Sequence, residues 1–148
     1  MKVDMTYWED EIGKTPKKIT VEAEPCAIFV RSKAEWQMAI AAEDKKVEAN
    51  KMVPIKIMPV EIPGGAIAVQ CFFMRHALGV VVSLASVGKP KPVEEDRIAD
   101  RAIFSPIEDG IIYKGEILAI INIFPAAIGE ELPDKEAVYA WMQQRYKE

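Results

Sequence analysis

Apolar and polar residues alternate along several short segments of this chain, which is the period-two pattern of a half-buried β-strand. Lys18–Glu24 carries an apolar residue at every second position, and Val53–Ile62 repeats the pattern over a longer stretch. Pro54 and Pro59 interrupt this second segment. Because proline has no backbone N–H to donate, the two prolines predict an edge strand or a bulge.

Continuous apolar runs predict further strands. Ala66–Met74 is apolar on both faces, which is typical of a central strand, and it follows the turn signal Pro63-Gly64-Gly65. Other runs of this kind are Cys26–Arg31, Gly79–Ser86, Arg101–Phe104 and Glu116–Phe124. Short strands separated by turn signals at intervals of roughly eight to twelve residues predict a mostly-β fold, built as a small barrel or sandwich.

The segment Ala34–Ala49 admits two interpretations. Its alanine, glutamate, glutamine, methionine and lysine residues are good helix formers. Trp36, Met38 and Ile40, however, alternate strictly with Gln37 and Ala39, and a helical period explains fewer of the apolar positions. We therefore predict a strand over Trp36–Ala42, followed by a turn at Glu43–Lys46.

The end of the chain has a different period. Pro133 suits the first turn of a helix, and four apolar residues then recur at a spacing that places them on one helical face: Ala137, Val138, Trp141 and Met142. The sequence thus predicts one C-terminal helix over residues 133–147. With no repeat or linker in view, we expect a single domain over residues 1–148, made of an N-terminal arm (1–16), a β core (17–125) and this helix.

Composition narrows the class of protein. Half of the residues are apolar and 28% are charged, so a real hydrophobic core is expected. The net charge of −4 disfavours binding to nucleic acid, whose phosphates an acidic surface repels. No apolar run approaches the roughly 20 residues that cross a bilayer, and the acidic residues of Asp4–Glu11 do not fit a signal peptide. We expect a cytoplasmic protein without a membrane partner.

Motifs for metals, cofactors and covalent catalysis are missing from the sequence. One histidine and two widely separated cysteines cannot supply the four ligands of a structural zinc site. Pro63-Gly64-Gly65 lacks the lysine and hydroxyl residue of a phosphate-binding loop, and no GxSxG elbow occurs. The acidic run Glu94-Glu95-Asp96 fits a solvated loop better than a magnesium site. We expect no metal and no cofactor.

The pair Arg75-His76 stands out because it interrupts an apolar stretch that runs from Ala66 to Ala85. Burying a charge without a partner is costly, so the pair is expected either at a solvent-facing cleft or against acids from elsewhere in the chain. The favoured interpretation is an internal ion pair of Arg75 with the acidic loop. The alternative is an anion site formed by Arg75, His76, Glu94, Glu95, Asp96 and Arg97, where Arg75 binds a carboxylate or phosphate and His76 donates or shuttles a proton.

A family resemblance rests on short segments that occur in a fixed order: Ala41–Asp44, Ile55–Ile57, Glu61–Pro63, Arg75–Gly79, Pro92–Arg97, Ala102–Pro106 and Asp109–Leu118. Over roughly Trp36–Phe124 the chain resembles the archaeal family known as domain of unknown function twenty-two. The resemblance implies an archaeal, cytoplasmic protein and supplies no catalytic residues. The N-terminal arm and the C-terminal helix lie outside it.

Two functional hypotheses follow. The first, which we favour, is a non-catalytic binding or assembly module that self-associates as a homo-oligomer, with a dimer as the default. The second is a small-molecule enzyme that acts on a phosphate- or carboxylate-bearing metabolite at the Arg75/His76 site. A pocket that converges on Arg75, His76 and acids would favour the enzyme, and a flat apolar patch would favour the assembly module.

Overall fold

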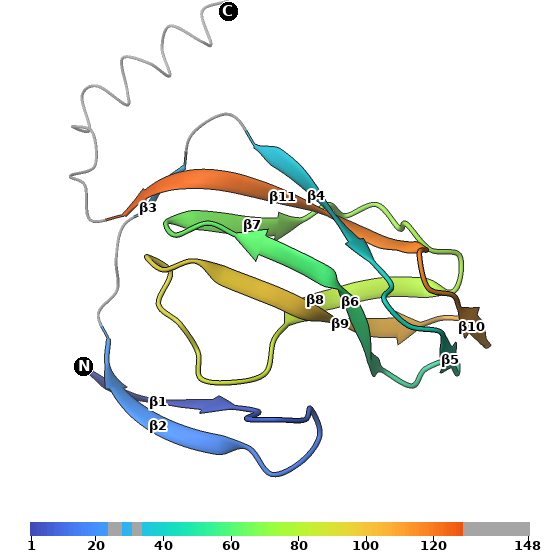
Figure 1. Cartoon of the computed structure of the whole chain (residues 1–148), viewed down its shortest axis with the longest axis horizontal. Coiled ribbons are helices and arrows are strands. Elements are labelled where there is room, and N and C mark those ends of the chain that lie inside the picture. Colours follow the sequence, from blue (N-terminus) through green and yellow to red (C-terminus); the bar gives the residue numbers. More distant parts are fainter. Residues whose placement is uncertain (24–27, 31–33, 129–148) are drawn as a thin grey trace, which may run out of the picture.

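A computed structural model describes residues 1–23, 28–30 and 34–128 of the chain (Figure 1). Within these ranges all regular elements are strands: β1 (Lys2–Tyr7), β2 (Lys17–Glu22), β3 (Ile28–Val30), β4 (Glu35–Ile40), β5 (Lys45–Val47), β6 (Val53–Ile62), β7 (Ala66–Gln70), β8 (Gly79–Ala85), β9 (Arg97–Pro106), β10 (Gly110–Ile112) and β11 (Ile117–Ile128). The prediction of a mostly-β fold is confirmed. The helix predicted over 133–147 and the residue Cys26 lie outside the described residues.

Two principal sheets share one hydrophobic core. In the first, the long strand β11 is central, with β4 and β3 antiparallel along one edge and β7 antiparallel along the other. The second is the antiparallel sheet β6-β9-β8. The two sheets meet where Ala41, just past β4, forms an isolated bridge with Ile57 of β6. Side chains from both sheets pack into a single buried cluster, but the sheets do not close into the barrel that the sequence suggested as one option.

The N-terminal segment expected to form an arm is a β-hairpin instead. β1 pairs with β2 in register, with Val3 opposite Val21. The hairpin contributes no residue to the buried core and lies beside the two principal sheets, in the blue part of Figure 1. A backbone hydrogen bond from Gly88 N–H to the carbonyl of Trp8, 2.6 Å long, connects it to the body of the protein.

The strand predicted in the segment Ala34–Ala49 from its alternating pattern is confirmed, because Glu35–Ile40 is the strand β4. Its neighbour β5 forms where we expected only a turn, since Lys45–Val47 pairs with β10. The prolines of β6 also behave as predicted: β6 is an edge strand of its sheet, and its pairing with β9 shifts register between Lys56 and Val60.

Two strand predictions are wrong in detail. β7 ends at Gln70 and pairs only with β11, so the apolar run Ala66–Met74 is not a central strand. The apolar residues that follow β7 lie in a loop and are exposed. The continuous hydrophobic run therefore extends beyond the strand and does not by itself indicate burial. The strand β9 begins at Arg97 and not at the predicted Arg101, because β6 supplies a partner for its first residues.

The turn Pro63-Gly64-Gly65 is confirmed in detail. The N–H of Ala66 donates to the carbonyl oxygen of Pro63 over 2.9 Å, and Gly65 adopts φ = 77°, which glycine reaches without steric penalty. Gly64 is needed for another reason, since a Cβ at this position would lie 2.4 Å from the carbonyl oxygen of Glu94. The turn therefore packs directly against the acidic loop.

Among residues 1–23, 28–30 and 34–128 we find no helix that is long and apolar enough to cross a membrane.

Candidate functional site

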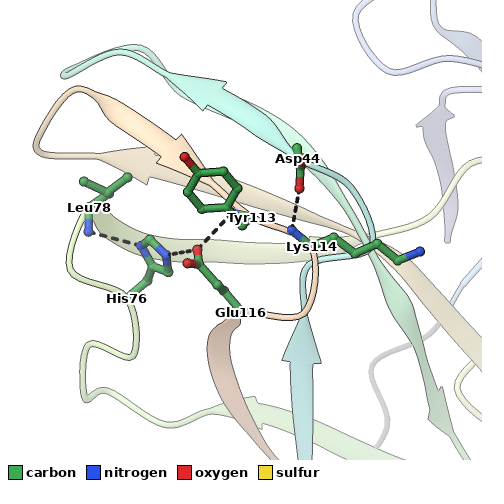
Figure 2. Close-up of polar contacts among 6 residues, drawn as sticks. All are labelled: Asp44, His76, Leu78, Tyr113, Lys114 and Glu116. Carbon is green, nitrogen blue, oxygen red and sulfur yellow. Dashed lines mark hydrogen bonds and ion pairs between the residues drawn. The ribbon is translucent and has the colours of Figure 1, made fainter.

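His76 forms the best-defined polar contact near the predicted site. Its Nε2 lies 2.7 Å from Oε2 of Glu116, and its Nδ1 lies 3.2 Å from the backbone nitrogen of Leu78 (Figure 2). The imidazole is only 11% exposed, and Phe104 meets it edge-on with a ring-centroid distance of 6.0 Å. His76 thus lies at the boundary of the core, in the β7–β8 connection and beside the turn that leads into β11.

The hydrogen bonds of His76 define its tautomer. Because the N–H of Leu78 donates to Nδ1, that nitrogen carries a lone pair, and the ring proton resides on Nε2, where it is donated to Glu116. Both ring nitrogens are therefore engaged by the protein itself. In this arrangement neither nitrogen is available to take a proton from a substrate, so the imidazole acts as a connection between two loops.

Glu116 joins the β7–β8 connection to its own turn through one carboxylate oxygen. Its Oε2 accepts one hydrogen bond from the Nε2–H of His76 and a second, 3.0 Å long, from the backbone N–H of Tyr113. These two contacts, with that of His76 the larger, hold the pKa of the Glu116 carboxyl below its ordinary value of 4.5. The same turn is held from its other side, where the N–H of Lys114 donates to Oδ1 of Asp44 over 2.8 Å (Figure 2).

We expect Glu116→Gln to weaken the protein in a pH-dependent way. Since the folded state lowers the pKa of Glu116, the carboxylate stabilises the fold fully above pH 4.5, and this contribution is lost as the pH falls through the lower pKa of the folded state. Urea unfolding at pH 7 should show the variant less stable by about 0.5 kcal/mol, because solvent around the 39% exposed Glu116 screens the difference between a charged and a neutral acceptor. The two proteins should converge as the pH falls below the lowered pKa that Glu116 has in the folded state.

The matched control is Glu94→Gln, which removes a charge from an exposed side chain that has no hydrogen-bond partner in the part of the chain that the structure describes. Its unfolding curves should follow those of the unmodified protein at every pH. Parallel pH profiles for Glu116→Gln and the unmodified protein would contradict a functional His76–Glu116 connection.

Arg75 points away from this connection. Its guanidinium lies 5.6 Å above the ring of Phe73, and Nη2 is 3.5 Å from the sulfur of Cys71. Within the described residues Arg75 forms no ion pair, so the internal ion pair with the acidic loop that we favoured is not formed. The consecutive residues Arg75 and His76 thus face different surroundings, one solvent and the other the core boundary.

The other four candidate residues lie at the far end of β7 from Arg75. Asp96 accepts the N–H of Gly64 over 2.7 Å, and Arg97 donates to the carbonyl of Ala66, the first residue of β7. Glu94 and Glu95 are exposed on the same loop. The structure therefore places Glu94, Glu95, Asp96 and Arg97 around the Pro63–Ala66 turn, and it does not bring them together with Arg75 and His76.

The loop after β7 exposes three large apolar side chains in succession. Phe72 is 99% exposed, Phe73 is 73% exposed and Met74 is 51% exposed. Beside them lies a hollow of about 200 Å³, lined by the loop itself and by Gln70, Val80, Val81 and Leu118. We call Phe72–Arg75 the aromatic loop. His76 does not line this hollow.

A second apolar surface covers the outer side of the first sheet. Trp36 of β4, Asn122 of β11 and Val69 of β7 stand directly opposite one another, so they project from the same face of the sheet. Their neighbours on β11, Ile121 and Ile123, are buried on the other face. The outer sheet face, defined by Trp36, Met38, Ile67, Val69, Cys71, Ile120, Asn122 and Phe124, carries no charge.

The outer side of the second sheet is different. There Lys56 stands opposite Arg101, and Glu61 stands opposite Ile98. Charged residues are what a solvated sheet face normally presents. The outer side of the second sheet therefore carries charges that the outer sheet face of the first sheet lacks.

A larger hollow lies away from all six predicted site residues. It measures about 380 Å³ and opens between the loop of the N-terminal hairpin and the strands β5 and β6, with Asp10, Glu43, Lys45 and Lys56 in its lining. Among the described residues no three histidine, cysteine, aspartate or glutamate side chains gather where they would hold a metal ion.

The mostly-β chain, whose described part has a polar loop connection beside apolar surfaces, belongs to a family of proteins of unknown function. The chain is a member of the family described as domain of unknown function DUF22, which matches residues 2–110. The uncharacterized protein MJ0614 of the archaeon Methanocaldococcus jannaschii is 26% identical over 113 residues, which are 76% of this chain and 86% of that protein. No solved structure matches the chain.

The family match confirms the resemblance seen in the sequence and corrects its extent. The match begins at residue 2, so the N-terminal hairpin lies inside the family region and not outside it. It ends at residue 110, before Glu116 and the central strand β11. His76 is thus inside the matched region, and its partner is outside it.

Sequence reasoning missed Glu116 and the outer sheet face. Glu116 is separated from His76 by 40 residues, and one glutamate after a glycine turn carries no local signal. The alternation of Trp36 and Met38 was visible, but it does not say whether the apolar side faces inward. In β4 the inward-facing side chain is that of Ala39, which is fully buried, whereas Trp36 is 75% exposed.

Proposed function

We propose that this protein is a non-catalytic assembly module that forms a homodimer through its aromatic loop. The observation that carries the proposal is the succession of exposed side chains from Phe72 to Met74. Fully burying a Phe or Met side chain contributes about 1.5–3 kcal/mol of favourable free energy. Association that buries these three exposed side chains would therefore be stabilised. Arg75, stacked on Phe73, adds the side-chain type most enriched with aromatics at interface centres.

A second copy of the chain is the partner that fits this surface. A twofold interface must be self-complementary, with projection and cavity on the same patch. The aromatic loop has both, since Phe72 projects beside a hollow of about 200 Å³. Apolar cavities of about 150 Å³ accept benzene, so the hollow has room for a phenyl ring from the other protomer.

Sedimentation equilibrium of Phe72→Asp tests this proposal. The unmodified chain should be a dimer at micromolar concentration, and Phe72→Asp should raise the dissociation constant by about 100-fold or more, because a central aromatic anchor contributes about 2 kcal/mol and occurs twice. Ile98→Asp is the matched control. Ile98 is also an exposed apolar residue, but it lies at the opposite end of β9 from Pro106, the partner of Gly79.

A monomeric unmodified chain at 100-fold higher concentration would overturn the proposal. So would a Phe72→Asp variant that dimerises as tightly as Ile98→Asp, since the contact would then lie on another surface. Circular dichroism of each variant shows whether the fold is retained.

One observation favours a second candidate, an enzyme acting on an anionic metabolite. Arg75 has no acidic partner among the described residues, so its guanidinium is open to a carboxylate or phosphate beside the hollow. Against this, both nitrogens of His76 are engaged and no acid joins them there except Glu116. Phosphate or acetate that raises the melting temperature of the unmodified chain, but not that of Arg75→Ala, would support this candidate.

A further inference from the structure

The hollow of about 380 Å³ beside the N-terminal hairpin lies between two charged surfaces. On one side are the strands β5, β6 and β9, and on the other is the hairpin loop, which contributes Asp10, Glu11 and Ile12. Figure 1 shows the hairpin alongside the second sheet. Hollows of roughly 300–1,000 Å³ are those that hold small molecules in proteins. We call this one the hairpin hollow, and it has the size of a small-molecule site.

Three cations line the strand side of the hairpin hollow. Lys56 of β6 and Arg101 of β9 are direct cross-strand partners, so two positive charges stand next to each other on one face of the second sheet. Lys45 adds a third charge from β5. Like charges directly opposite each other destabilise a sheet. An anion bound between them removes the repulsion, so the strand side is suited to an anionic group.

These cations have donors that the protein itself does not use. Among the residues that the structure describes, neither the ammonium of Lys45 nor that of Lys56 forms a hydrogen bond or an ion pair. Arg101 engages Asp100 through Nη1 alone, which lies 3.0 Å from the carbonyl oxygen and 3.2 Å from the carboxylate. Its Nε and Nη2 have no partner in the same set of residues. Two such guanidinium donors hold a phosphate in bidentate fashion.

Acids also line the hairpin hollow, and the three cations do not neutralise them. Within the described ranges, no ion pair of 4.0 Å or less joins two residues of the lining. Glu11 pairs instead with Lys14 at 2.6 Å, and Glu43 accepts the backbone N–H of Lys56 over 3.0 Å. The carboxylate of Asp10 is left without a hydrogen bond or an ion pair to any described residue.

Asp10 differs in this respect from the other acids of the hairpin. Asp4 lies 2.7 Å from Lys18, and Glu9 contacts Lys17. An acid that lines a hollow and has no cationic partner is suited to bind the ammonium group of a ligand. The hairpin hollow therefore offers a group of cations on its strand side and an anion on its hairpin side.

We propose that the hairpin hollow binds a small phosphorylated amine. The phosphate lies between Lys45, Lys56 and Arg101, and the ammonium group lies against Asp10. At pH 7 a phosphate group carries a charge of about −1.5 to −2 and three acceptor oxygens, which match three cations better than a carboxylate does. The site goes beyond the assembly proposed above and shares no residue with the aromatic loop, so either can fail alone.

O-phosphoethanolamine and ethyl phosphate are matched probes, because they differ in the ammonium group. Each is titrated into the isotope-labelled chain, and amide resonances should shift saturably at residues 10–12, 43–45, 54–56 and 101. O-phosphoethanolamine should bind about tenfold more tightly, since it alone forms a charge-assisted contact with Asp10. Equal affinities, or no shifts at millimolar concentrations, would overturn the proposal. Shifts confined to the aromatic loop would place the anion at Arg75 and overturn it as well.

Lys45→Met should raise the dissociation constant of both probes about tenfold, because it removes one cation from the phosphate. Lys46→Met is the matched control, since Lys46 is the next residue of β5 and does not line the hollow. It should leave both affinities unchanged. The amide spectrum shows whether each variant is folded, and Lys56→Met, at an exposed position, provides the same test if Lys45→Met is not. Equal affinities for Lys45→Met and Lys46→Met would overturn the proposal.

Asp10→Asn tests the ammonium contact separately. The variant should reduce the preference for O-phosphoethanolamine over ethyl phosphate from about tenfold to about twofold or less. Its affinity for ethyl phosphate should not fall, because that probe makes no contact that needs the carboxylate. An undiminished preference in Asp10→Asn would overturn the assignment of the ligand as a phosphorylated amine.

Discussion

Phe104→Ala should lower the free energy of unfolding by about 3–5 kcal/mol, measured by urea denaturation at pH 7. Phe104 is fully buried in the middle strand of the second sheet, where it stands opposite Val53 of β6 and Val81 of β8. Its ring also meets His76 edge-on. Truncation therefore leaves a cavity between three strands that the rigid sheet cannot collapse to fill, and it removes one wall of the histidine site.

Ile98→Ala on the same strand is the control for Phe104→Ala. Ile98 is 55% exposed, so its truncation should change stability by about 0.5 kcal/mol or less. A loss below 1 kcal/mol for Phe104→Ala would show that the ring of Phe104 is not packed in the core as described here.

Gly79→Ala is expected to destabilise the protein by about 3 kcal/mol, again measured by urea denaturation. A Cβ at position 79 would lie 2.3 Å from the carbonyl oxygen of Ser105 and 2.8 Å from the Cα of Pro106. Both contacts are with backbone atoms of β9, which cannot move away without breaking the pairing of β8 with β9. Overpacking of this kind commonly reduces stability by about 1–3 kcal/mol, and backbone contacts lie at the upper end.

The neighbouring substitution Val80→Ala separates a steric effect at Gly79 from a general effect of changing β8. Val80 is partly exposed, so its truncation should reduce stability by less than about 1 kcal/mol. If Gly79→Ala is as stable as Val80→Ala, the close approach of β8 to β9 is wrong. A shift of the backbone at residue 79 should also loosen the position of His76, because the carbonyl oxygen of His76 accepts the N–H of Gly79.

Gly79 has a structural requirement that the sequence does not reveal. Gly79 does not adopt a positive φ, unlike Gly65 or Gly115. Its small size matters because Ser105 and Pro106 of β9 pass close to it, and both are more than twenty residues away in the sequence.

The structure bears out only part of the reasoning about the predicted site. His76 and Arg75 were singled out because charged and polar residues interrupt an apolar run, and the structure shows that His76 is indeed held in a defined polar contact. The acids proposed as its partners are held elsewhere, by the turn that packs against them. Charge complementarity alone does not select between Glu116 and Asp96, because both are carboxylates at least twenty residues from His76 in the sequence.

The sequence by itself determined the features that depend on neighbouring residues: the strand at Glu35–Ile40, the turn at Pro63-Gly64-Gly65 and the proline-disturbed edge strand β6. Side-chain alternation and the torsion limits of glycine and proline act within a few residues, so they can be read locally. Only the tertiary structure decided that β11 is central, that His76 pairs with Glu116 and that Trp36 faces outward. These depend on which distant strands pair and which side of a sheet the core occupies, and a period-two pattern is the same for either side.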